Sequence, residues 1–117
     1  MRCIIVDDSE EFLASASRLL GSQGMDVLAV ASNGEQALDL AGKLGPDLAL
    51  VDIELGEEDG IELSHELASH APSVRVVLVS SYSLADIGEL VAHSPAAGFL
   101  PKTDLGAAAI RQLLAQS

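Results

Sequence analysis

Short apolar runs alternate along the chain with longer segments in which apolar residues recur every three or four positions. The apolar runs predict five β-strands, because continuous runs of this length are typical of strands buried on both faces of a parallel sheet. We place these strands at residues 2–6, 27–31, 48–51, 74–79 and 97–100. The intervening segments predict helices, so the pattern indicates an α/β domain whose parallel sheet has helices on both faces.

Capping residues indicate where several of the five predicted helices begin. Asp8 with Glu11 and Asn33 with Gln36 have the spacing of capping boxes, so we expect the first two helices to start there. Thr103 is expected to cap the last helix. The first two helices end at residues that favour termination, namely Gly21, Gly24, Gly45 and Pro46.

The second half of the chain has weaker local signals. Residues 54–59 are rich in carboxylates, and we expect them to form an acidic loop. The pattern of residues 60–69 predicts a helix, and Pro72 prevents it from continuing further. Residues 85–92 predict a further helix, in which Gly88 costs about 1 kcal/mol relative to alanine. We therefore expect local mobility around Gly88.

Length and charge limit what the protein binds. The 117 residues suit one domain, residues 1–117. Acidic residues outnumber basic ones by 18 to 6, and the net charge of −12 argues against direct binding to nucleic acid or to anionic lipid. No apolar run approaches the roughly 20 residues that span a bilayer, and no signal segment is evident at the N-terminus. We expect a cytoplasmic protein.

Cysteine and histidine do not indicate a metal centre. Cys3 is the single cysteine and lies in the first predicted strand, so we expect a buried structural thiol and no disulfide. His65, His70 and His93 lack the spacing of metal ligands, and we expect them to lie on solvated surfaces.

Polar groups stand at the ends of four predicted strands. Asp7 and Asp8 follow the first strand, Asp52 the third, Ser80 the fourth and Lys102 the fifth. In a parallel sheet these positions share one edge, which is where ligands bind in such folds. We therefore expect three carboxylates, one hydroxyl and one ammonium to meet.

Such a cluster of carboxylates needs a compensating positive charge. Two unit charges about 4 Å apart repel by roughly 4 kcal/mol at an effective dielectric constant near 20. Magnesium favours one or two carboxylates, water and a substrate phosphate, so Asp8 and Asp52 could bind it directly while Asp7 holds a bound water. The Asp52 carboxylate could then attack phosphorus, with Lys102 and Ser80 neutralising the phosphoryl oxygens.

Four segments carry a resemblance to a known family. They are IIVDD at 4–8, LVDIELGEEDG at 50–60, VVLVSS at 76–81 and GFLPK at 98–102. In this order and spacing the chain resembles, over almost its whole length, the receiver domain of bacterial two-component response regulators of the chemotaxis regulator type. The resemblance implies a flavodoxin-like, doubly wound sheet of order 2-1-3-4-5.

The resemblance also implies a function and a set of site residues. Asp52 would accept a phosphoryl group from a sensor histidine kinase or a histidine phosphotransfer protein, and the chain would catalyse only this transfer to itself. Mg²⁺ or Mn²⁺ would be held by Asp7, Asp8, Asp52 and the backbone carbonyl of Glu54. Ser80 and Lys102 would contact the phosphoryl group. The implied readout surface is formed by the fourth helix, fifth strand and fifth helix, where an output domain, a partner protein or a second receiver would bind.

Several residues depart from the common family pattern. Ser80 stands where threonine is commoner, and Phe99 occupies the aromatic switch position where tyrosine is frequent. Phe99 serves equally well as a plain core residue. Gly56 replaces a frequent proline, so we expect a more flexible loop after Asp52. Thr103 replaces a proline that often follows the lysine, which excludes a cis proline there.

Two other functions remain open at this point. One is a receiver-like scaffold that is not phosphorylated, although the acidic pair, acceptor, hydroxyl and lysine are all present. The other is a phosphatase with an aspartate nucleophile, but its acid two residues later would be Glu54 instead of aspartate. Whether the chain works alone or belongs to a longer regulator is also left open by the sequence.

Overall fold

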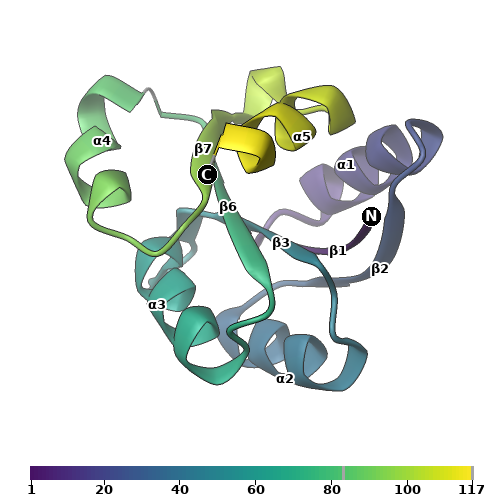
Figure 1. Ribbon diagram of the computed structural model, residues 1–117, viewed down its shortest axis with the longest axis horizontal. Coiled ribbons are helices and arrows are strands. Elements are labelled where there is room, and N and C mark those ends of the chain that lie inside the picture. Colours follow the sequence, from purple (N-terminus) through teal and green to yellow (C-terminus); the bar gives the residue numbers. More distant parts are fainter. Residues whose placement is uncertain (83, 117) are drawn as a thin grey trace.

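The computed structural model describes residues 1–82 and 84–116 (Figure 1). The helices are α1 Glu10–Ser22, α2 Gly34–Leu44, α3 Gly60–His70, α4 Leu84–Ala92 and α5 Ala107–Gln116, with a 3₁₀ turn η1 at Lys102–Asp104. The strands are β1 Arg2–Val6, β2 Asp26–Ala31, β3 Leu48–Asp52, β4 Glu54–Leu55, β5 Glu58–Asp59, β6 Arg75–Ser80 and β7 Gly98–Pro101.

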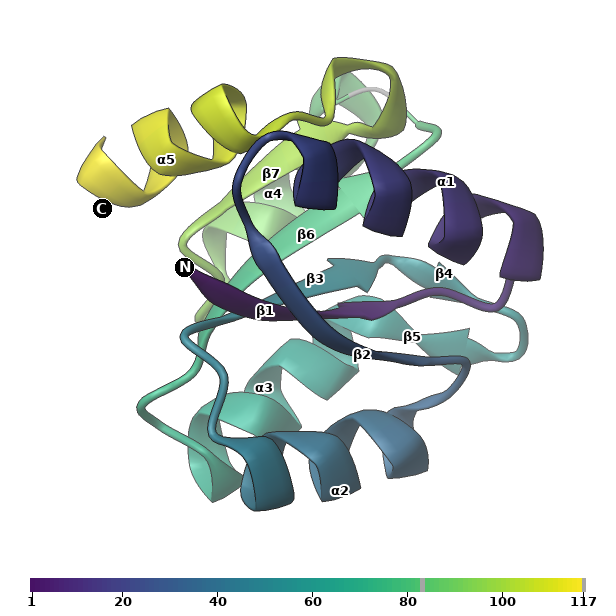
Figure 2. The same cartoon turned by 90° about the vertical axis from the view of Figure 1, so that its right-hand side faces the viewer.

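The main sheet is parallel and has the order β2-β1-β3-β6-β7. In chain order these are the second, first, third, fourth and fifth strands of the sheet, so the predicted order 2-1-3-4-5 is confirmed. Helices α1 and α5 cover one face, while α2, α3 and α4 cover the other (Figures 1 and 2). The domain is therefore a three-layer α/β/α structure of the flavodoxin-like type.

Successive side chains along each strand point to opposite faces of the sheet, and this divides the core into two parts. Along β1, Ile4 and Val6 face α2 and α3, while Cys3 and Ile5 face α1 and α5. All four side chains are buried, and each fully buried isoleucine stabilises the fold by about 1.5–3 kcal/mol. The predicted burial of Cys3 is confirmed, and burial raises the pKa of its thiol to about 11.

Two of the predicted helix caps are wrong. The N-cap of α1 is Ser9 and not Asp8, because the Ser9 hydroxyl accepts a hydrogen bond from Phe12 N at 3.2 Å. The last helix begins at Ala107, well after Thr103, and Ala107 N donates to Gln23 Oε1 at 2.7 Å. A side chain that is distant in sequence therefore supplies the cap that the local pattern assigned to Thr103.

The start of α2 agrees with its predicted capping box. Asn33 Oδ1 accepts a hydrogen bond from Gln36 N at 2.9 Å, and Gln36 Oε1 accepts one from Ser32 N at 2.9 Å. Gly45, in the left-handed conformation, ends the helix as predicted.

The acidic segment 54–59 is an antiparallel hairpin and not the loop that the sequence suggested. Strands β4 and β5 pair across a turn in which Gly56 has a φ of 63°. Proline has φ fixed near −65° and could not occupy that position. Glu58 fixes the hairpin to α2, because its Oε1 accepts a hydrogen bond from Gly34 N at 3.1 Å.

The exposure of the three histidines agrees with the expectation from the sequence. His65, His70 and His93 are all exposed. None of the helices in the described part of the chain is long and apolar enough to cross a bilayer.

Gly60 begins α3 at a point where the chain passes directly beside Asp52. A Cβ on Gly60 would collide with the backbone carbonyl of Asp52, and Gly60 N donates to Ile53 O at 2.7 Å. We predict that Gly60→Ala lowers the free energy of unfolding by about 3 kcal/mol, at the upper end of overpacking effects, because the neighbour is backbone.

The matched control is Gly42→Ala in α2, where no atom lies within 4 Å of the added Cβ. This change should raise the free energy of unfolding by about 0.5–1 kcal/mol, because alanine favours a helix interior. Urea denaturation of both variants measures the two values. Equal stability of the Gly60 variant and the wild type would contradict the close approach to Asp52.

Candidate functional site

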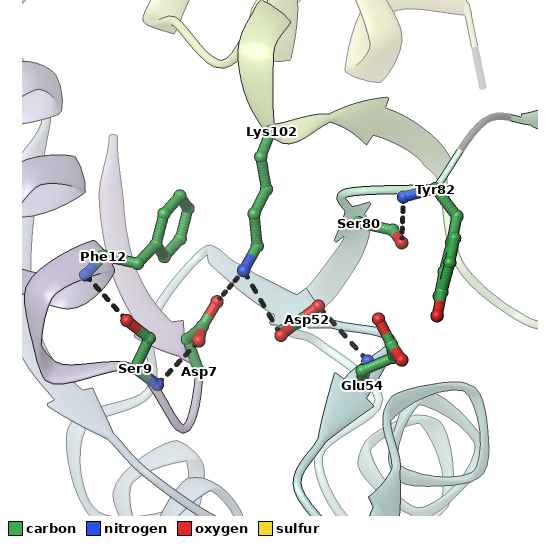
Figure 3. Close-up of polar contacts among 8 residues, drawn as sticks. All are labelled: Asp7, Ser9, Phe12, Asp52, Glu54, Ser80, Tyr82 and Lys102. Atoms are coloured by element: carbon green, nitrogen blue, oxygen red, sulfur yellow. Dashed lines mark hydrogen bonds and ion pairs between the residues drawn. The ribbon is translucent and has the colours of Figure 1, made fainter.

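The site lies at the carboxyl edge of the main sheet. Asp7 follows β1, Asp52 ends β3, Ser80 ends β6 and Lys102 follows β7. Because these strands are parallel and adjacent, the four side chains converge at one end of the molecule (Figure 3). The structure thus brings together the groups that the sequence places after separate strands.

Three carboxylates form the acidic part of the site. Asp7, Asp8 and Asp52 each present one oxygen within 4.8 Å of the other two. Asp7 is fully buried and Asp52 is 4% exposed, whereas Asp8 is exposed. The shift of the α1 cap to Ser9 leaves the Asp8 side chain available to this cluster.

Backbone groups orient the two buried carboxylates. Asp7 Oδ1 accepts a hydrogen bond from Ser9 N at 2.8 Å, and Asp52 Oδ1 accepts one from Glu54 N at 3.2 Å. In each case the donor is two residues further along the chain. The short turns after β1 and β3 therefore fix the direction of both side chains.

Lys102 bridges the second oxygens of these carboxylates. Its Nζ lies 2.7 Å from Asp7 Oδ2 and 3.4 Å from Asp52 Oδ2. Asp7 Oδ2 is a buried oxygen, and its polar contact in the described chain is this ion pair with Lys102. One ammonium thus balances part of the charge of three carboxylates.

The acidity of Asp52 reflects its crowded surroundings. Burial and the neighbouring charge of Asp7 raise its pKa from 3.8 to about 6, although Lys102 and the Glu54 N–H act in the opposite direction. Burial would lower the pKa of Lys102, but its contacts with Asp7 and Asp52 outweigh burial and raise this pKa above 10.5.

Ser80 and Tyr82 form the side of the site next to β6. Ser80 is fully buried, and its Oγ accepts a hydrogen bond from Tyr82 N at 2.9 Å. The Tyr82 side chain is 51% exposed, and the exposed Glu54 lies on the same side of Asp52 (Figure 3).

The remaining predicted site residues lie outside the acidic cluster. The side chain of Glu54 is exposed, and the role of its backbone carbonyl as a metal ligand stays a prediction. Phe99 is partly buried and packs against the core on the side of α2, α3 and α4. Its assignment as a switch residue also stays a prediction.

The sequence analysis missed one contact of the site. The ring of Phe12, on α1, lies with its centroid 4.3 Å from Lys102 Nζ. No local pattern links Phe12 to a lysine near the other end of the chain. The Phe12 side chain is partly buried and packs against the core on the side of α1 and α5.

The donor set suits a hard divalent cation. Three carboxylates lie together, and the ammonium of Lys102 balances only part of their negative charge. Oxygen ligands with water in the remaining positions are what Mg²⁺ takes in proteins. The residues present therefore fit the metal that the sequence predicts.

This arrangement defines a flavodoxin-like α/β domain with an acidic site at the carboxyl edge of its sheet. The model of the response regulator receiver domain family matches residues 3–114. The chain belongs to this family.

Individual relatives agree with this assignment. The transcriptional regulatory protein LnrK of Bacillus subtilis is 33% identical over 105 residues, which are 87% of this chain and 47% of LnrK. The solved receiver domain of a modulated diguanylate cyclase from Desulfovibrio desulfuricans is 31% identical, with a TM-score of 0.81 over 98% of this chain and 90% of that one.

A solved response regulator protein from Burkholderia pseudomallei is 28% identical, with a TM-score of 0.80 over 97% of this chain and 65% of that one. That structure holds a phosphorylated aspartic acid, a calcium ion and citrate. The chain spans between about a quarter and a half of the length of the curated relatives it matches, which include regulators and methylesterases.

The raised pKa of Asp52 makes stability depend on pH. A carboxyl whose pKa is raised from 3.8 to about 6 by folding stabilises the fold when protonated. This contribution is fully present below about pH 3.8 and is lost as the pH rises through about 6. At pH 7.5 without metal, Asp52→Asn should therefore raise the free energy of unfolding by about 2–3 kcal/mol.

Urea denaturation in EDTA measures this effect at pH 7.5 and at pH 4, where the difference should largely vanish. The control is Asp39→Asn on α2, whose side chain is 56% exposed and pairs with Lys43 at the surface. Its effect should stay within about 0.5 kcal/mol at both pH values. Destabilisation by Asp52→Asn at pH 7.5 would contradict the crowding of negative charge.

Proposed function

We propose that this domain is the phosphoacceptor of a phosphorelay, in which Asp52 receives a phosphoryl group from a phosphohistidine. The donor is a sensor histidine kinase or a histidine phosphotransfer protein, and the reaction depends on Mg²⁺ or Mn²⁺. The observation that carries the proposal is the position of Asp52, 4% exposed, between two further carboxylates and the Lys102 ammonium. We place the protein in the cytoplasm, where such donors act.

The transfer forms one bond and breaks one. An Asp52 carboxylate oxygen attacks phosphorus, and the P–N bond of the phosphohistidine breaks with its electron pair passing to the imidazole nitrogen. The other ring nitrogen of the imidazole carries a proton taken from water, so the histidine leaves as the neutral ring. The products are an aspartyl phosphate and a free histidine. The reaction needs mainly positioning and neutralisation of charge on the phosphoryl oxygens, so the site requires no further base.

The surrounding residues divide these tasks. Asp7, Asp8 and Asp52 would hold the divalent cation, together with the Glu54 carbonyl. When bound, the cation neutralises charge on the carboxylates and on the phosphoryl oxygens. Lys102, already 3.4 Å from Asp52 Oδ2, forms an ion pair with a phosphoryl oxygen. Ser80 donates its hydroxyl hydrogen to another.

Two further points support the proposal. The Burkholderia relative with a phosphorylated aspartic acid and a calcium ion shares this fold and family. The phosphatase alternative requires an acid two residues after the nucleophile, whereas the exposed Glu54 is not one of the three residues of the acidic cluster. We therefore infer that the domain acts as a signalling phosphoacceptor and not as an enzyme on external substrates.

Phosphorylation is read out at the surface of α4, β7 and α5. New phosphoryl oxygens at Asp52 draw Ser80 and Lys102 inward, which changes the chain after β6 and around Phe99. Leu90, on α4, is 59% exposed and offers apolar area to a partner. The occupant is an output domain, a partner protein or a second receiver, and the net charge of −12 argues against nucleic acid.

The first test is phosphorylation by a small donor. Incubation with acetyl phosphate and Mg²⁺ should add one phosphoryl group to the wild type, because the site itself supplies the catalysis. Asp52→Asn should remain unmodified, while the exposed Asp39→Asn should react like the wild type. Intact-mass spectrometry measures each product. The proposed function would be wrong if the Asp52→Asn variant were modified, or if the wild type were not.

The second test concerns the readout surface. Beryllofluoride with Mg²⁺ mimics the phosphoryl group, and it should change amide hydrogen exchange in α4 and β7 by severalfold while leaving α2 unaffected. Hydrogen exchange with mass spectrometry compares the two states. Asp52→Asn supplies the control, since it should show no change in either segment. Unchanged exchange in the wild type would exclude this surface as the responding element.

A further inference from the structure

The ring of Phe12 forms one wall of the space that holds the Lys102 ammonium. The ring centroid lies 4.3 Å from Lys102 Nζ, within the range of a cation–π contact (Figure 3). We propose that Phe12 is the positioning residue of Lys102 and keeps its ammonium at the acidic site during phosphoryl transfer. This inference rests on the proposed function, because it concerns how Lys102 serves that reaction.

The ammonium of Lys102 depends on contacts from other elements of the fold. The side chain extends from η1, after β7, to the carboxylates that follow β1 and β3. A lysine side chain has a flexible stem of four carbons, so its head group stays in place only where neighbours hold it. Here those neighbours are Asp7, Asp52 and the ring of Phe12, and the side chain remains 20% exposed.

The same turn fixes both the ring and one of the carboxylates. Ser9 N donates to Asp7 Oδ1 at 2.8 Å, and Ser9 Oγ accepts from Phe12 N at 3.2 Å. The Phe12 side chain also packs against the core between the sheet and the layer of α1 and α5. The ring and the Asp7 carboxylate are thus held in fixed relation on two sides of the ammonium.

The contribution of Phe12 differs from that of the carboxylates because the ring carries no net charge. A divalent cation held by Asp7 and Asp52 would share the carboxylate charge that attracts Lys102. Esterification of Asp52 replaces its carboxylate charge with that of the phosphoryl group. The attraction of the ring face persists through both changes. Phe12 therefore keeps the ammonium at the site when its carboxylate partners are engaged elsewhere.

A plain packing role for Phe12 makes different predictions. If the ring only filled space, its loss would affect the fold and would act independently of Lys102. If it positions the ammonium, its effect on transfer requires Lys102 to be present. The two roles are separated by a double-mutant cycle and by a direct measurement of the contact.

The contact itself is measured by NMR in the metal-free protein. The ε-methylene protons of Lys102 should be shifted upfield by the ring in the wild type and in Phe12→Tyr, which retains an aromatic face. Phe12→Leu should return them to the values of a free lysine. Wild-type shifts equal to those of a free lysine would refute the contact, even if Phe12→Leu failed to fold.

The effect on transfer is measured with acetyl phosphate, Mg²⁺ and intact-mass spectrometry. Phe12→Leu should slow phosphorylation of Asp52 by about three- to tenfold, a change in the range of one cation–π contact, while Phe12→Tyr stays within about twofold of the wild type. In a Lys102→Gln background, Phe12→Leu should have no further effect. Thermal unfolding checks that each variant is folded.

The outcomes separate this inference from the proposed function. If acetyl phosphate did not modify the wild type, the proposed function would be wrong, whereas the NMR shifts would still test the contact between Phe12 and Lys102. A wild type that reacts while Phe12→Leu reacts equally fast would overturn only the positioning role. Equal slowing by Phe12→Leu in the wild-type and Lys102→Gln backgrounds would assign Phe12 to packing and overturn the inference as well.

Discussion

The structure depends on holding like charges together at one edge of the sheet. Asp7 and Asp52 are almost fully buried beside each other, and the ammonium of Lys102 bridges the Oδ2 atoms of the two carboxylates. Such a cluster opposes folding, and the raised pKa of Asp52 records that cost. The apolar strands that end at these residues provide the compensating stability. The burial of the apolar strands therefore offsets the repulsion between the carboxylates at their ends. Because Lys102 balances only part of this negative charge, the site favours binding of a further cation.

The parallel order of the strands explains why distant residues act as one group. Each strand that carries a site residue runs in the same direction, so its last residue arrives at the same edge as that of its neighbour. The turns after β1 and β3 then orient Asp7 and Asp52 through the N–H groups of Ser9 and Glu54. The sheet therefore brings the two carboxylates to the same edge, and the N–H groups two residues after each carboxylate set the orientation of the side chains.

Much of the fold and of the site could be predicted from the sequence, because the signals involved are local. Continuous apolar runs located the strands of the main sheet, and the polar residues after them located Asp7, Asp8, Asp52, Ser80 and Lys102. Two of the failures depend on a contact between distant segments. The cap at Ala107 comes from Gln23, and the ring beside Lys102 comes from α1. At α1 itself, Asp8 and Ser9 are both good caps, and local preference could not choose between them.

The hydrogen bond between Glu58 and Gly34 N has a consequence for exchanging segments between relatives. It ties the hairpin that follows Asp52 to the first turn of α2, and a Cβ on residue 34 would lie only 2.8 Å from Glu58 Oε1. The two positions thus form a matched pair although they belong to different elements. A chimera that takes its second helix from one receiver and its hairpin from another can therefore lose this hydrogen bond or introduce a clash. Both are avoided when residues 34 and 58 are taken from the same protein.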